Sequence, residues 1–239
     1  MTVLYGIDGC RGGWLVARVP EASEREFHPE FFVRTNLQSI FAQARKGVAV
    51  VAIDIPIGIP ETGERRCDIR AREELPNGRK SCVFPVPTRS ALPATNYIEA
   101  CLLNHKASGR RISVQSFGIL PKIREIDRLM TPGLQQFVRE AHPEVTFAVL
   151  ADQTDLGKKT CAAGRAKRLA VLADQGLRLS LEEIRQQRML LGRHLVKIDD
   201  LIDAAACVLT AKRIGDKQHI TFPSTVCKDS RKLRMEIVS

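Results

Sequence analysis

The sequence predicts an α/β fold, and two of its features lead to this prediction. The first third of the chain carries short apolar strand patterns separated by glycine-rich turns, whereas the later part carries amphipathic helical patterns. Between them, residues 48–53 (VAVVAI) form a continuous apolar run. Such a run is typical of a strand that is buried on both faces. We therefore expect a central strand in a sheet that helices cover.

Three strands and a helix are predicted before this central strand. Val3–Asp8 and Trp14–Val19 are joined by the short GCRGG connection, a spacing that favours an antiparallel hairpin. A third strand is expected near Phe27–Val33. Asn36–Lys46 has apolar residues at helical spacing, begins with a good capping residue and is followed by Gly47. The order is therefore three strands, a helix and the buried strand.

Next comes a long basic loop, from Pro56 to about Pro93, in which only Asp68–Leu75 has a helical pattern. Irregular stretches of this length are uncommon in compact domains and tend to be functional. Further helices are predicted over Thr95–Asn104, Val114–Leu120 and Pro121–Met130. We interpret residues 56–135 as a loop and helical insertion within one domain of residues 1–239.

The α/β pattern returns in the last hundred residues. A short strand is predicted before Pro143, followed by three amphipathic or alanine-rich helices and two closing strands. These elements are Val138–His142, Gly164–Gln175, Leu181–Leu191, Asp199–Ile214, His219–Phe222 and Lys232–Val238.

Composition limits the class of protein. The chain has 239 residues, of which 44% are hydrophobic and 27% charged, so it has enough apolar surface for a core. No window reaches the roughly 18 apolar residues of a membrane span. The seven cysteines occur singly, without a C-x-x-C pair, which favours reduced thiols over disulfides or a zinc site. We expect a soluble cytoplasmic protein without a membrane partner.

Two aspartates follow the predicted strands. Asp8 ends the first strand and Asp54 follows the buried one. Ligands of open α/β sheets bind beyond the carboxyl ends of the strands. If the two strands are parallel neighbours, the carboxylates face one another and repel unless a cation separates them, and oxygen ligands suit Mg²⁺ or Mn²⁺. A turn at Asp8-Gly9 and a strand cap at Asp54 are the alternatives that need no ligand.

Glu144 and the start of the late helix supply further acids. Ordinary helix-start signals also explain Glu144, which follows Pro143, and an N-cap explains Asp199 or Asp200. Asp203 lies deeper and shares a face with both, where like charges cost about 0.2–0.5 kcal/mol per pair. Three alanines follow it and let the helix approach the sheet. We predict Asp203 as a metal ligand, Asp200 as its partner and Asp199 as the N-cap.

Carboxylates from four separated parts of the chain predict a metal-dependent phosphodiester hydrolase. In a two-metal mechanism one ion activates the attacking water and the other stabilises the leaving oxygen. The candidate catalytic residues are Asp8, Asp54, Glu144, Asp200 and Asp203. Within this set, Asp8, Asp54 and Asp203 are the candidate ligands of Mg²⁺ or Mn²⁺.

The positive charge favours a nucleic-acid partner. The chain carries a net charge of +10, and a phosphate backbone held over the metals requires basic groups. Most basic clusters are solvated surface, which is the alternative. The candidates on the long loop lie next to Asp54: Arg65, Arg66, Arg70, Arg72, Arg79, Lys80 and Arg89. The sequence leaves DNA and RNA, and the oligomeric state, open.

Taken together, these motifs resemble the predicted-nuclease family of RNase H-like fold catalogued as domain of unknown function 429. The resemblance covers nearly the whole chain and rests on the segments GIDGCRGGW (6–14), IDIPIG (53–58), RCD (66–68), SCVFP (81–85), PKI (121–123), HPEV (142–145) and DDLIDA (199–204). It implies a mixed five-stranded sheet with three leading antiparallel strands, flanked by helices. It also implies Asp8, Asp54 and an aspartate of the late helix as metal ligands. Lys122, from the PKI segment, joins the candidate nucleic-acid contacts.

Two other functions remain open at this point. A non-catalytic nucleic-acid-binding protein of the same fold is one, although it has no need of unpaired, mutually repelling carboxylates. A kinase-like phosphotransferase is the other, since a similar strand-Asp-Gly turn opens such enzymes. Those kinases generally need two copies of the fold, and this chain shows no internal repeat.

Overall fold

A mixed sheet of five strands forms the centre of the computed structural model, which describes residues 2–20 and 26–239. Within these residues the order is β3-β2-β1-β4-β5, with β1 Val3–Cys10, β2 Gly13–Val19, β3 Glu30–Arg34, β4 Ala49–Ile53 and β5 Val138–Glu140. The first three strands are antiparallel, and β4 and β5 run parallel to β1. The predicted α/β fold, with three leading antiparallel strands in a mixed five-stranded sheet, is confirmed.

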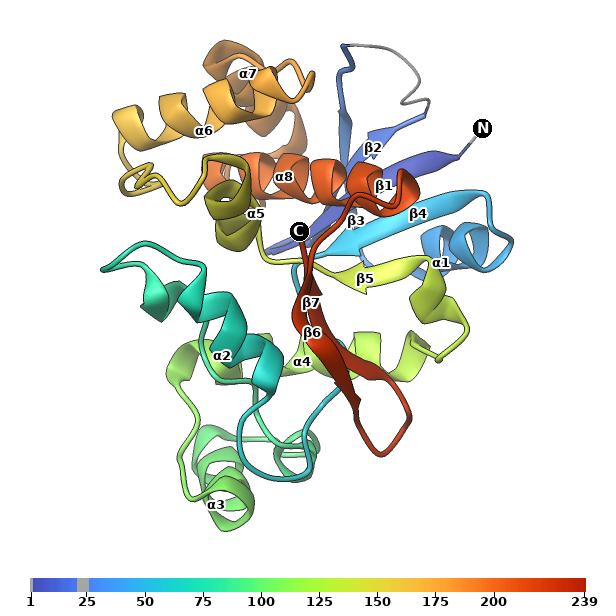
Figure 1. Ribbon diagram of the computed structural model, residues 1–239, viewed down its shortest axis with the longest axis vertical. Helices are drawn as coiled ribbons and strands as arrows, with labels where there is room; N and C mark the ends of the chain where they lie inside the picture. Colours follow the sequence, from blue (N-terminus) through green and yellow to red (C-terminus); the bar gives the residue numbers. More distant parts are fainter. Residues whose placement is uncertain (1, 21–25) are drawn as a thin grey trace.

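Four helices cover one face of the sheet (Figure 1). The long helix α8 (Ile198–Gly215) lies against β1 and β4, with α5 (Pro143–Leu150), α6 (Ala162–Asp174) and α7 (Leu181–Leu191) around it. Even-numbered residues of β1 and β4, such as Leu4 and Ala52, are buried on this side together with the alanines of α8. Side chains alternate between the faces of a strand, so Asp8 and Asp54 belong to the same face.

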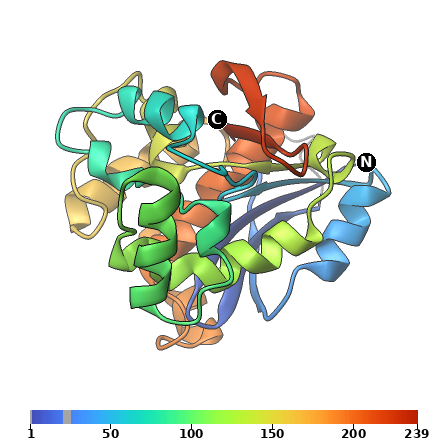
Figure 2. The same cartoon turned by 90° about the horizontal axis from the view of Figure 1, so that it is seen from below.

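The opposite face packs against α1 (Gln38–Arg45) and α4 (Val114–Leu129), and α3 (Tyr97–Ser108) lies beyond α4 (Figure 2). The prediction of two helices divided at Pro121 is wrong, because Pro121 lies inside the single helix α4. A proline removes one hydrogen bond of the helix. Leu120 and Ile123, both fully buried on either side of it, hold the two halves in the same core.

The closing strands form a separate hairpin. β6 (Thr221–Lys228) and β7 (Arg234–Val238) pair antiparallel with each other. A bridge between Val238 and Ala141 and an ion pair between Glu236 and Arg139, at 2.6 Å, link β7 to the end of β5. The hairpin packs against α2 (Arg66–Glu73), the helix of the long loop, which also contains short 3₁₀ turns at Lys80–Cys82 and Arg89–Ala91. Among the described residues, none of the helices has the length and apolarity needed to cross a membrane.

Candidate functional site

Asp8 and Asp54 lie at the same end of two neighbouring parallel strands. Asp8 lies near the end of β1, and Asp54 directly follows β4. The N–H of Asp54 donates to the carbonyl of Ile7 at 2.9 Å, which continues the register of the two strands to these positions. The structure therefore brings together the two acids that the sequence analysis expected to meet.

Asp203 reaches the same place from α8 because this helix packs unusually close to β1. A Cβ built on Gly6 would lie 2.1 Å from the carbonyl oxygen of Ala204, so only glycine fits under the helix backbone. The side chain of Asp203, one residue earlier, is 5% exposed. The small residues that follow Asp203 thus allow the close approach that places its carboxylate at the strand ends.

A cavity of about 380 Å³ contains the three carboxylates of Asp8, Asp54 and Asp203. This volume lies in the range of small-ligand sites, roughly 300–1,000 Å³. Much of the remaining wall is apolar and comes from the long loop, α4 and β7: Ile55, Pro56, Val83, Phe84, Val86, Ile119 and Ile237. The cavity therefore combines buried carboxylates with an apolar wall.

The carboxylates destabilise one another's charge in this pocket. Burial raises the pKa of Asp8, and the charges of Asp54 and Asp203 raise it further. Burial also raises the pKa of Asp54, although His142 and Lys159 oppose the shift. The pKa of Asp203 rises to about 6 for the same reason, again against the effect of Lys159. Ionising all three acids therefore requires positive charge nearby.

Lys159 supplies positive charge from the loop between α5 and α6. Its Nζ lies 2.5 Å from Oδ2 of Asp203. Burial lowers the pKa of Lys159, but the carboxylates of Asp203, Asp8 and Asp54 outweigh burial and raise it overall. Sequence reasoning missed this residue, because a lysine beside Lys158 in a polar loop has the pattern of solvated surface.

Glu144 lies at the cavity but is already paired. Both of its carboxylate oxygens accept hydrogen bonds from the guanidinium of Arg168, at 2.8 and 2.9 Å. The side chain of Arg168 is 1% exposed, so the pair is buried. Glu144 occupies the first turn of α5 after Pro143, as its helix-start interpretation predicts. Its charge is neutralised, which weakens its candidacy as a catalytic acid.

In the first turn of α8, Asp199 and Asp200 make other contacts than expected. The helix begins at Ile198, and Oδ2 of Asp200 accepts the N–H of Lys197 at 2.9 Å. Asp199 pairs instead with Nε of Arg165 at 2.9 Å. The prediction of Asp199 as the N-cap is wrong because the helix begins before Asp199. Asp200 performs the capping, and this hydrogen bond competes with its predicted role beside Asp203.

Arg65 is buried in the wall of the same cavity, where two carboxylates already bind its guanidinium. It is 2% exposed, and its guanidinium donates to Asp68 and to both oxygens of Glu140, at 2.5 to 3.2 Å. Glu140 also accepts the N–H of Ile57 at 2.6 Å. The prediction of Arg65 as a nucleic-acid contact is therefore wrong. This buried network instead ties α2 and the start of the long loop to the end of β5.

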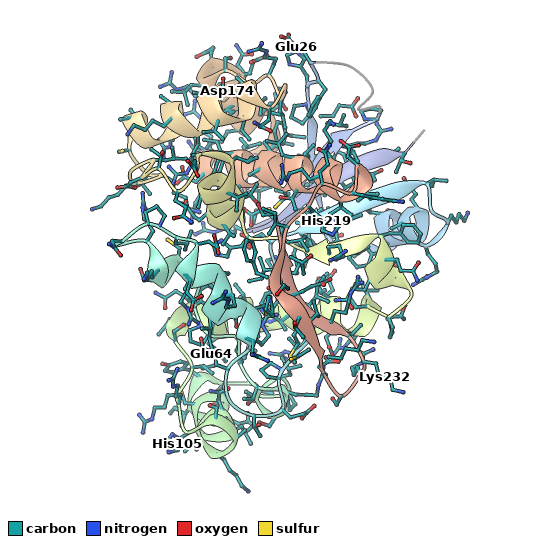
Figure 3. The ribbon with its side chains drawn as sticks, viewed as in Figure 1. Glu26, Glu64, His105, Asp174, His219 and Lys232 are labelled. Carbon is teal, nitrogen blue, oxygen red and sulfur yellow. The ribbon has the colours of Figure 1, made fainter. Side chains whose placement is uncertain are left out.

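The other basic candidates fall into three groups. Lys122 lines the cavity, donates to the carbonyl of Gly13 at 2.6 Å and lies 4.7 Å above the ring of Trp14. Exposed side chains on α2 and the loop after it form the second group: Arg66, Lys80 and Arg70, the last of which is paired with Glu73. The third group is held by acids or the backbone: Arg72 by Glu64 (labelled in Figure 3) and the carbonyl of Val83, Arg79 by Asp155, and Arg89 by Asp127 and Asp229.

His142 is a further group at the cavity. Its Nε2 lies 3.2 Å from the carbonyl oxygen of Cys82. Its Nδ1 is buried and has no hydrogen-bond partner within the described residues. The structure leaves one ring nitrogen available and places the ring close enough to affect the pKa of Asp54.

The candidate ligand atoms are oxygens, the element that divalent ions such as Mg²⁺ prefer. Asp8, Asp54 and Asp203 offer the oxygens that Mg²⁺ and Mn²⁺ prefer, and Oδ1 of Asp203 is buried without a hydrogen-bond partner in the described residues. Across residues 2–20 and 26–239, no three His, Cys, Asp or Glu side chains form a complete metal-binding set as they stand. Here the second oxygen of Asp203 is bound to Lys159. What the site offers a cation is therefore its chemistry, namely the unpaired oxygen of Asp203 and the mutual repulsion of the three acids, and not a preformed set of ligands.

Comparison with known proteins gives one match. A family model described as "Protein of unknown function (DUF429)" matches residues 6–226. The matched part includes all three cavity aspartates, the long loop and α8. No curated protein and no solved structure matches the chain.

Proposed function

Starting from the fact that the chain belongs to the DUF429 family, whose description names no activity, we propose from the site itself that the protein is a metal-dependent nuclease. The reaction is hydrolysis of a phosphodiester of DNA or RNA by water. One observation carries this proposal: three carboxylates from β1, the end of β4 and α8 are buried in one cavity without enough positive charge to balance them.

The sheet order is compatible with an RNase H-like fold. Three antiparallel strands followed by two parallel ones, with acids at the ends of the first and fourth, is the arrangement that the resemblance implied. We include this fold in the proposal. Folds host many functions, so the assignment of an activity rests on the cavity and not on the sheet.

The residues of the cavity divide the work of hydrolysis. Asp8, Asp54 and Oδ1 of Asp203 would hold Mg²⁺ or Mn²⁺. When bound, such an ion lowers the pKa of a coordinated water and offsets the charge that develops on the phosphate and the leaving oxygen. The ammonium of Lys122 would bind a phosphate oxygen at the rim. The free Nδ1 of His142 can accept or donate a proton.

Nucleic acid would reach the cavity along the side that carries α2. Arg66, Arg70 and Lys80 are exposed there, and the long loop forms part of the cavity wall. Contacts of this kind bind phosphates without reading the base sequence. A cytoplasmic location completes the proposal, because all seven cysteines are free thiols.

The proposal is tested by cleavage of labelled single-stranded and duplex DNA and RNA with and without Mn²⁺. Wild type should cleave at least one substrate only when the ion is present. Asp8→Asn should lose turnover by 100-fold or more, on the order expected for removing an essential metal ligand. Asp174→Asn makes the same chemical change on the exposed end of α6 (Figure 3) and should have no effect.

Two results would count against a nuclease. Nucleic-acid binding without cleavage in the presence of Mn²⁺ would favour the non-catalytic binding protein. Equal turnover by wild type and Asp8→Asn would place the chemistry outside this cavity.

A further inference from the structure

The loop that carries Lys159 is fixed to its surroundings at several points. A Cβ built on Gly164, in α6, would lie 2.1 Å from the carbonyl oxygen of Lys158, so this backbone rests directly on the helix. The same carbonyl accepts the N–H of Cys161 at 3.2 Å. The guanidinium of Arg168 donates to the carbonyl of Gly157 at 3.1 Å. These contacts set the backbone on both sides of Lys159.

Arg168 connects this loop to the cavity as well. The guanidinium that holds Gly157 also holds both oxygens of Glu144, which lines the cavity wall. The Glu144–Arg168 pair therefore positions the loop rather than adding charge to the site. With the loop held in this position, the ammonium of Lys159 contacts Asp203 at 2.5 Å.

Lys159 already fills one cation position beside the acids. Its Nζ lies 2.5 Å from Oδ2 of Asp203, in the cavity that also contains Asp8 and Asp54. The other lysine of the cavity, Lys122, is bound to the carbonyl of Gly13 at 2.6 Å. Within the described residues, Oδ1 of Asp203 has no hydrogen-bond partner, so it is the oxygen of this carboxylate that is left for a metal ion.

We propose that the site binds one divalent ion and that the ammonium of Lys159 takes the place of a second. Asp203 then serves both cations, with Oδ1 free for the metal and Oδ2 held by Lys159. This inference rests on the proposed function and replaces the two-ion arrangement with one ion and one lysine. In hydrolysis the ammonium would contact the charge that develops on the phosphate oxygens.

The experiment counts bound Mn²⁺ by calorimetry and by electron paramagnetic resonance, without substrate. Wild type should bind one ion per chain and give the spectrum of an isolated Mn²⁺. Lys159→Met keeps the unbranched stem but removes the charge, and it should bind two ions with the spectrum of a coupled pair. Lys159→Arg should bind one. Lys158→Met changes the exposed neighbouring lysine and should match wild type. Circular dichroism checks that each variant is folded.

The outcomes separate this inference from the proposed function. Two ions in wild type would overturn the role of Lys159 while leaving a metal-dependent nuclease intact. One ion in both wild type and Lys159→Met would show that the lysine does not occupy a cation position. No ion in wild type would remove the metal site and both proposals together. If Lys159→Met fails to fold, the wild-type stoichiometry still decides between one ion and two.

Discussion

Gly6→Ala should break the contact that brings Asp203 to Asp8. A Cβ at this position would lie 2.1 Å from the carbonyl oxygen of Ala204 and 2.3 Å from the nitrogen of Val208. A carbon and a carbonyl oxygen in close contact are separated by about 3.3 Å. Helix α8 would therefore have to retreat from β1 by roughly 1 Å, and backbone atoms cannot give way as the end of a side chain can.

The cost follows from the size of this displacement. Overpacking a core lowers the free energy of unfolding by about 1–3 kcal/mol. We expect a loss of about 3 kcal/mol or more here, because the clash is with helix backbone. For a chain of this size, about 3 kcal/mol lowers the melting temperature by roughly 6 to 12 °C. Misplacing a catalytic group by about 1 Å can reduce activity on the order of 100-fold. Mn²⁺ affinity should fall as well, because Asp8 and Asp203 separate.

Urea denaturation and Mn²⁺ titration of the same variant measure both effects. Gly118→Ala is the matched control, because this glycine lies inside α4 and a Cβ there meets no atom within 4 Å. It should stabilise the protein by about 0.5–1 kcal/mol, since alanine is the better helix former. Should Gly6→Ala stay within about 1 kcal/mol of wild type and bind Mn²⁺ normally, the packing of α8 does not set the site.

Two further predictions concern the aspartates of α8. Asp200→Ala should cost about 1 kcal/mol in urea denaturation, because it removes the acceptor for the N–H of Lys197. Asp199→Ala should not reproduce the loss of this cap, because Asp199 is bound to the partly buried side chain of Arg165 and not to the helix backbone. The pKa of Asp203 rises on folding from 3.8 to about 6, so the folded state holds this proton more tightly and stability falls as pH rises from about 4 to about 6. Asp203→Asn should remove this pH-dependent loss of stability, which is on the order of 3 kcal/mol. Equal pH profiles of the free energy of unfolding for wild type and variant would contradict the prediction.

Local sequence patterns predicted the sheet well. The apolar run before Asp54 indicated a buried strand, and the structure buries every residue of β4. Only the start signals of the helix over Pro143–Leu150 were recognised and not its length, because this helix is buried almost all round and therefore lacks a polar face. A period of 3.6 residues identifies only those helices that have one face in water.

Roles that depend on distant partners could not be assigned from the sequence. Arg65 lies in a proline-rich, basic loop and has the pattern of a surface residue. Its partner Glu140 is 75 positions away, at the end of a strand that the loop must fold against. Nothing local to either residue predicts this pair. The same holds for Arg168 and Glu144, which are 24 positions apart.

Such distant pairings determine which acids are still unpaired and could bind the proposed metal ion. Acids at strand ends can be found from the sequence, because buried strands are found from it. The cations that neutralise some of them come from loops and helices whose paths are set by tertiary contacts, as Gly164 and Arg168 set the path of the Lys159 loop. The sequence analysis therefore proposed five catalytic acids. The structure pairs one with arginine and assigns another to a helix cap, so that Asp8, Asp54 and one oxygen of Asp203 are the ligands that the proposed ion would use.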